Sequence, residues 1–182
     1  AMKAAVIYES MFGNTHVVAE HIRDGLAESL DAVVVPLSQA DQSALAGVDL
    51  VVVGGPTHAH GMTSAGSRSS AVEQAATKED LDLDEDAPGP GLREWLAALE
   101  APAAGVSVRG AAFDTRLHGP AALTGRASKK IAKQLTRHGL SILAEPESFL
   151  VDRDNHLIDG EADRARTWGS SLARALTVAA ST

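Results

Sequence analysis

The chain has 182 residues, of which 45% are hydrophobic and only 3% aromatic, and a formal net charge of -8. This length fits a single domain, and the composition predicts an aliphatic core. The acidic balance argues against a nucleic-acid groove, which needs clustered Lys and Arg. The lack of cysteine excludes disulfides, thiolate metal sites and a cysteine nucleophile. It also fits a reducing cytoplasm, which is the expected location. No apolar run approaches the ~20 residues of a membrane span, so we expect neither nucleic acid nor a membrane as a partner.

The first part of the chain contains three short apolar runs and one amphipathic segment. Val18, Ile22 and Leu26 fall on one stripe of an expected helix at residues 14–30. The apolar runs are nearly continuous, which is typical of strands buried on both faces. The strands expected here are residues 3–8, 32–37 and 48–53.

The middle of the chain differs in composition. Residues 62–91 are rich in Ser, Gly, Ala and acidic residues, and they end in Pro-Gly-Pro-Gly. We expect a loop insertion here, with one helical turn near 70–77. The alternation then resumes with a helix at 91–100, a strand at 105–113, a helix at 120–138, a strand at 140–151 broken by Pro146, and a helix at 159–179.

Strands that alternate with helices predict a parallel sheet covered on both faces. The crossovers between such strands are right-handed in almost all known cases. We therefore assign residues 2–182 to a single α/β domain.

The first strand is followed by a loop at residues 10–15, called the first loop below, which leads directly into a helix. A helix N-terminus presents unpaired N–H groups and a partial positive charge, so it binds a phosphate without a lysine. Glycine lets the backbone approach the anion, while the hydroxyl and amide side chains add donors. An ordinary strand-to-helix turn, with Asn14 or Thr15 as the cap, is the alternative. The candidate phosphate-binding residues are Ser10, Met11, Phe12, Gly13, Asn14 and Thr15.

The third strand is followed by a second loop at residues 54–62. In open α/β sheets, ligands bind beyond the carboxyl ends of the strands. Its two histidines suit stacking on a ring or donating hydrogen bonds; a glycine-rich connection with exposed histidines is the alternative. The pair has no third ligand at convincing spacing, so we expect no metal. The candidate residues are Pro56, Thr57, His58, Ala59, His60 and Gly61.

A third loop, expected at residues 113–119 after the fourth strand, borders the same crevice. Its polar side chains suit contacts with the polar edge of a ligand or with a substrate. An exposed turn, with Phe113 in the core, fits the sequence equally well. The candidate residues are Phe113, Asp114, Thr115, Arg116 and His118.

These features resemble the flavodoxin family. Residues 3–8 with the first loop are similar to the family's first strand and its Thr/Ser-x-Thr-Gly-x-Thr phosphate loop, in which Ser10, Gly13 and Thr15 match and Phe12 departs. The Ser-Met-aromatic-Gly variant is similar to that of flavodoxin-like NAD(P)H:quinone reductases. The resemblance implies a flavodoxin-like three-layer sandwich with a five-stranded parallel sheet in the order 2-1-3-4-5. It also implies FMN as the cofactor, with its phosphate on the first loop and its ring beside the second.

Two classes of function remain open. One is an FMN-binding redox protein, either an electron carrier or an NAD(P)H-dependent reductase, whose partners are NAD(P)H, a quinone or a redox protein. The acidic charge favours a carrier, whereas Arg116 and the histidines near the crevice favour a reductase. The other is a flavodoxin-like domain without cofactor that acts as a binding or regulatory module. Flavodoxins usually hold the flavin ring between aromatic side chains, often a Trp and a Tyr, whereas the one tyrosine of this chain, Tyr8, lies in the first expected strand. The sequence assigns no catalytic residue, and it is compatible with a homo-oligomer.

Overall fold

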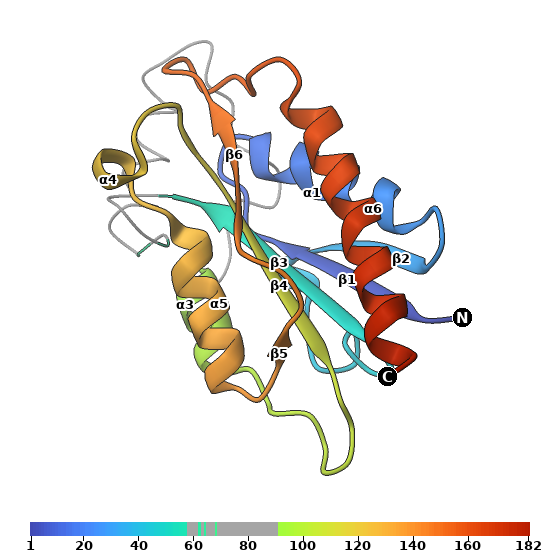
Figure 1. Cartoon of the computed structure of the whole chain (residues 1–182). Helices are drawn as coiled ribbons and strands as arrows, with labels where there is room; N and C mark the ends of the chain where they lie inside the picture. The colour runs from blue at the N-terminus through green and yellow to red at the C-terminus, as the bar shows by residue number, and fades with distance from the viewer. Residues whose placement is uncertain (58–61, 63, 65–67, 69–90) are drawn as a thin grey trace.

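The computed structural model describes residues 1–57, 62, 64, 68 and 91–182. In this part of the chain, a twisted parallel sheet is flanked by helices (Figure 1). Its strands follow the order β2-β1-β3-β4-β5, and β6 also pairs with β4. The strands are β1 (Lys3–Tyr8), β2 (Asp31–Pro36), β3 (Leu50–Pro56), β4 (Arg109–Leu117), β5 (Ser141–Ile142) and β6 (Glu147–Val151). The helices are α1 (Asn14–Leu26), α3 (Leu92–Ala97), α4 (Ala121–Thr124), α5 (Ala127–Arg137) and α6 (Glu161–Ala180), with a 3-10 turn at Leu37–Gln39.

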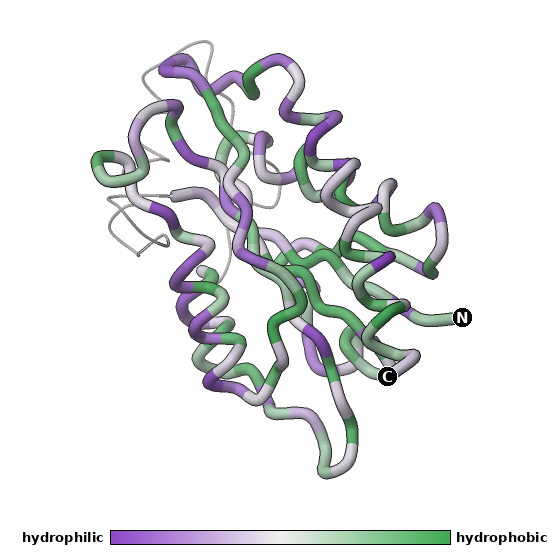
Figure 2. Tube along the Cα trace, viewed as in Figure 1, coloured by the Kyte–Doolittle hydropathy of each residue, from purple (hydrophilic) through white to green (hydrophobic). Residues whose placement is uncertain are grey.

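The sheet separates two apolar layers, as the continuous strands predicted. Side chains alternate across a strand, so Val6 and Tyr8 of β1 join the core beneath α1 and α6, whereas Ala5 and Ile7 join the core beneath α3 and α5. The tube in Figure 2 shows this hydrophobic centre with more polar outer helix faces. The α/β fold with helices on both faces and the predicted strand order are confirmed.

Helices α1 and α6 approach each other closely enough for their backbones to meet. A Cβ atom at Gly25 of α1 would overlap the carbonyl oxygen of Arg166 in α6. A Cβ atom at Gly169 of α6 would likewise overlap the carbonyl oxygen of Ile22 in α1. The two glycines therefore fix the spacing of this helix pair.

Several element boundaries differ from the sequence predictions. The expected helix at 120–138 is two helices, because the chain leaves the helical region at Gly125, where φ is 77°. The expected fifth strand is divided into β5 and β6, consistent with Pro146, which lacks an N–H group for the ladder. The fourth strand begins at Arg109, opposite Leu50 of β3, and extends to Leu117, four residues beyond its expected end. The first helix ends at Leu26 rather than at residue 30.

Among the described residues, no helix combines the length and the apolar character that a bilayer crossing requires. The insertion expected at 62–91 and its helical turn lie almost entirely outside the described residues. Both stay predictions.

Candidate functional site

The first loop turns sharply between β1 and α1. Gly13 adopts φ 91°, a left-handed conformation that favours glycine, and its N–H donates to Oγ of Ser10 at 3.1 Å. A Cβ atom at Gly13 would meet no atom within 4 Å, so open space rather than crowding surrounds this position. The backbone thus bends around an open space at the start of α1.

The start of α1 carries unpaired donors. Its first helical bond runs from the N–H of Val17 to the carbonyl of Gly13 at 3.0 Å, and no side chain caps the helix. Asn14 and Thr15 therefore do not form the simple side-chain cap of the alternative interpretation. Within the described residues, no protein acceptor meets the N–H groups of Met11, Phe12, Asn14 or Thr15. Together with the helix dipole, these donors suit an anion.

Side chains of the first loop and α1 are held by other parts of the fold. Oγ1 of Thr15 lies 2.7 Å from Oγ1 of Thr115 in β4, in a buried hydrogen bond. Nδ2 of Asn14 donates to the carbonyl of Asn155 at 2.5 Å, across a sequence separation of 141 residues. The loop is therefore oriented before any ligand arrives.

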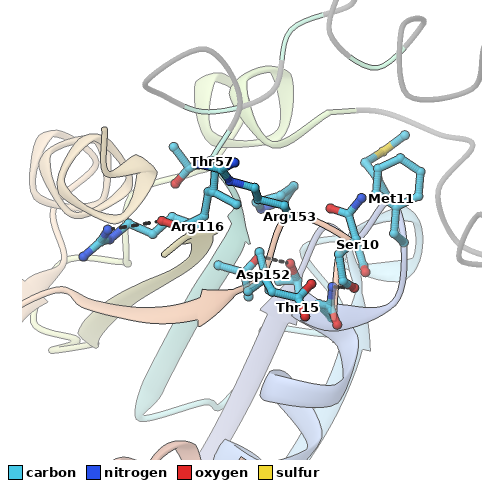
Figure 3. A pocket seen from close by; sticks show the side chains of 14 residues that line it. Ser10, Met11, Thr15, Thr57, Arg116, Asp152 and Arg153 are labelled. Carbon is cyan, nitrogen blue, oxygen red and sulfur yellow. Dashed lines mark hydrogen bonds between the residues drawn. The ribbon is translucent and has the colours of Figure 1, made fainter. Parts of the chain in front are cut away.

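A cavity of about 520 Å³ opens beside the first loop (Figure 3). It lies at the carboxyl ends of the strands, where ligands of open α/β sheets bind. In Figure 3, side chains from β1's loop, from the end of β3, from β4 and from the segment after β6 converge on it. Its lining residues are Ser10, Met11, Phe12, Asn14, Thr15, Pro56, Thr57, Thr115, Arg116, Leu117, Val151, Asp152, Arg153 and Asn155.

Residues 54–57 and 62 of the second loop are described. Pro56 is the last residue of β3, and it lines the cavity together with Thr57. Oγ1 of Thr57 also accepts a hydrogen bond from the N–H of Ala127 at 3.1 Å, at the beginning of α5. The candidate residues His58, Ala59, His60 and Gly61 lie outside the described residues.

The expected third loop is mostly strand, because β4 extends to Leu117. Thr115 and Arg116 line the cavity, whereas His118 is exposed and is not part of the lining. The guanidinium of Arg116 donates to the carbonyl of Gly119 at 2.8 Å and to Oγ1 of Thr124 at 3.1 Å. This arginine therefore braces the segment after β4, instead of leaving its whole guanidinium free for a ligand.

Phe113 and Asp114 lie behind the cavity. Phe113 is fully buried, and its ring packs edge-on against the rings of Phe149 and Trp168. Asp114 is also fully buried, and its Oδ2 accepts the N–H of Ser128 at 2.8 Å in the first turn of α5. Neither is among the residues lining the cavity.

The buried carboxyl of Asp114 has an unusual electrostatic setting. Burial raises its pKa, while hydrogen bonds from Ser128 and the charge of Arg126 act in the opposite direction. Its Oδ1 atom is buried without a hydrogen-bond partner among the described residues. Asp114 thus serves the start of α5, where Thr57 holds the neighbouring N–H group.

The structure adds residues that the sequence analysis missed, namely Leu117, Val151, Asp152, Arg153 and Asn155. Four of them end β6 or follow it, at the same sheet edge as the first loop. The rule that ligands bind beyond the carboxyl ends of strands, applied to the fifth strand as well, was the available signal. No group of three or more metal-ligating side chains stands out among the described residues.

Comparison with solved structures finds the same fold in several proteins of similar size. A flavodoxin from the domain Archaea superposes with a TM-score of 0.64 at 20% identity, over 97% of this chain and 99% of that one. Oxidised flavodoxin 1 from Bacillus cereus gives 0.62 at 16% identity, over 94% and 97%. A flavodoxin, WrbA-like protein from Agrobacterium tumefaciens gives 0.61 at 16% identity, over 97% and 98%.

Comparison with curated proteins finds no match. The family model of flavodoxin, in contrast, matches residues 6–115. This range includes the first loop, the second loop and most of β4. Because this match spans more than half of the chain and the strand order agrees with it, the chain belongs to the flavodoxin family.

Proposed function

We propose that this protein binds FMN in the cavity beside the first loop and serves as an electron carrier. The observation that carries the proposal is the set of four unpaired N–H groups at the start of α1, which opens onto a cavity of about 520 Å³. A phosphate monoester fits this donor set, because the N–H groups and the helix dipole both favour an anion. When bound, FMN supplies the redox chemistry, while the protein supplies position and electrostatics.

The chain's own residues would divide the work of holding FMN. Backbone N–H groups of the first loop, with the hydroxyls of Ser10 and Thr15, would hold the phosphate. Thr57, Leu117 and Val151 also line the cavity and would border the rest of the FMN molecule. Membership of the flavodoxin family and the net charge of -8 support a carrier that docks on a basic partner.

Titration of the purified protein with FMN tests the proposal. We expect saturable binding with a change in the flavin spectrum, and no consumption of NADPH or NADH when a quinone is added. NAD(P)H oxidation coupled to quinone reduction would assign the protein to the reductases instead. Failure to bind FMN even in excess would contradict the proposal altogether.

A cofactor-free binding module is a second candidate, and one observation favours it. Among the described lining residues, Phe12 is the single aromatic side chain, so the pair of rings that flavodoxins use to sandwich the flavin is not found there. Titration with FMN separates this candidate from the first. Because His58 and His60 are candidates for stacking on the flavin, replacing either one should change the bound flavin's spectrum.

A further inference from the structure

We propose that Arg153 is a second, cationic element of the phosphate site and makes the cavity selective for a flavin that carries a phosphate. The inference rests on the proposed function, because it concerns the same ligand. It goes beyond the first loop, which contains no lysine or arginine. The segment that presents Arg153 comprises residues 152–156 between β6 and α6, called the β6–α6 turn here.

The β6–α6 turn is closed by its own hydrogen bonds. Oδ1 of Asp152 accepts the N–H groups of Asp154 and His156, both at 2.9 Å. The N–H of Asp152 donates to the carbonyl of His156 at 2.8 Å, and Asn155 adopts φ 62°. These bonds define the backbone path at Arg153, so its side chain starts from a fixed position.

The turn is also anchored to the rest of the fold. Asn155 accepts the amide of Asn14, which ties the turn to the first loop. Below the turn, the guanidinium of Arg164 in α6 binds the carboxylates of Glu147 and Glu161 at 2.7 and 2.8 Å, as well as the carbonyl of Ser148. Hence the first loop and the turn form two connected walls of one cavity.

The charges in the lining favour an anion, although the protein as a whole is acidic. The described lining contains two guanidinium groups, those of Arg116 and Arg153, against the single carboxylate of Asp152. That carboxylate is engaged by the N–H groups of its own turn. Arg116 donates to carbonyl and hydroxyl oxygens and forms no ion pair within the described part of the chain. Glu161 is near enough for its pKa to be lowered by the charge of Arg116, but its carboxylate is paired with Arg164.

Arg153 differs from Arg116 because its guanidinium has no ion pair or hydrogen bond within the described part of the chain. Figure 3 shows it between Thr57 on one side and Ser10 and Met11 on the other. A planar guanidinium matches the geometry of phosphate oxygens and forms charge-assisted hydrogen bonds with them. The first loop would then supply N–H donors, and Arg153 a countercharge, to the same phosphate.

The test compares FMN with riboflavin, which lacks the phosphate, on wild type and on Arg153→Gln. We expect Arg153→Gln to raise the Kd for FMN about fivefold, the upper range for an exposed ion pair. The Kd for riboflavin should stay unchanged. The difference for FMN should shrink in high salt, because an exposed charge pair is screened.

Arg174→Gln is the matched control, since Arg174 is exposed on α6 and is not among the lining residues. It removes the same charge from the protein and should leave both affinities unchanged. An unchanged FMN affinity in Arg153→Gln, or equal losses for FMN and riboflavin, would overturn the inference while leaving the proposed function intact. Wild type that binds no FMN would overturn both.

Discussion

The first loop and the β6–α6 turn border one cavity, but they are built in opposite ways. In the first loop, four backbone N–H groups have no protein acceptor among the described residues. In the turn, the N–H groups of Asp152, Asp154 and His156 are all used internally, and its cationic group beside the cavity is the side chain of Arg153. A loop that binds a ligand through its backbone needs particular residues at particular positions, so it can be recognised as a motif in the sequence. A turn that binds through one side chain has no such motif.

The largest effect is expected for Thr15→Ala, which changes the first loop. We expect a loss of about 1.5–3 kcal/mol in FMN binding, the contribution of a hydrogen bond to a charged group. Thr136→Ala, which removes an exposed hydroxyl bonded to its own helix in α5, is the control. Calorimetric titration measures both variants, and an unchanged affinity in Thr15→Ala would mean that the Thr15 hydroxyl does not bind the phosphate.

Asp114 provides the next test, because the sequence suggested a ligand contact and the structure places it behind the cavity. Asp114→Ala removes the acceptor of the Ser128 N–H group, and we expect it to lower the free energy of unfolding by about 1–3 kcal/mol. FMN affinity should change little. Urea unfolding and FMN titration of the same variant separate these roles, since a large loss of affinity with unchanged stability would make Asp114 a ligand-binding residue.

The same carboxyl predicts a dependence of stability on pH. Burial raises its pKa from the ordinary value of 3.8, so the folded protein binds this proton more tightly than the unfolded chain does. The contribution of Asp114 to stability is therefore largest in acid and decreases as pH rises from about 4 through the raised value. Asp114→Asn does not titrate, so its stability relative to wild type should increase over that range in urea unfolding. Parallel pH curves would contradict the raised pKa.

Gly13→Ala tests whether the shape of the first loop, and not only its donors, matters. Alanine at φ 91° is strained, so we expect a loss of about 1–2 kcal/mol in unfolding free energy, together with weaker FMN binding. Gly160 is a close match, because it precedes α6 with φ 88° and a Cβ atom there would also meet nothing within 4 Å. Gly160→Ala should lose similar stability but retain FMN affinity. Equal effects of both variants on FMN binding would mean that the loss is a general consequence of strain.

The smallest expected effect concerns the turn. Asn155→Ala places alanine at φ 62°, which we expect to cost about 1 kcal/mol or less relative to asparagine. Asn155→Gly keeps both the conformation and the carbonyl that accepts the Asn14 amide, so it should resemble wild type in thermal unfolding. If the glycine variant is as unstable as the alanine variant, the asparagine side chain itself carries the role.

Features that depend on local sequence could be predicted, whereas features that depend on pairing between distant segments could not. Apolar runs such as residues 3–8 predicted the buried strands, because a parallel sheet imposes that composition locally. The predicted ends of the fourth strand were wrong, because the ends of β4 depend on its pairing with β3, which no local pattern determines. That shift placed Phe113 and Asp114 in an expected loop, although both are buried in the strand. Arg153 was missed for a different reason: the expected end of the fifth strand, residue 151, is also the end of β6, but a single arginine in the turn that follows forms no motif.

The close approach of α1 and α6 at Gly25 and Gly169 involves residues that do not line the cavity. Helix α1 begins at the first loop, and α6 begins soon after the β6–α6 turn, so each wall is attached to one member of the helix pair. A methyl group at either glycine would force the two backbones apart. Because the two walls are attached to these helices, we expect a methyl group at Gly25 or Gly169 to change the width of the cavity, and with it ligand affinity, from a position outside the lining.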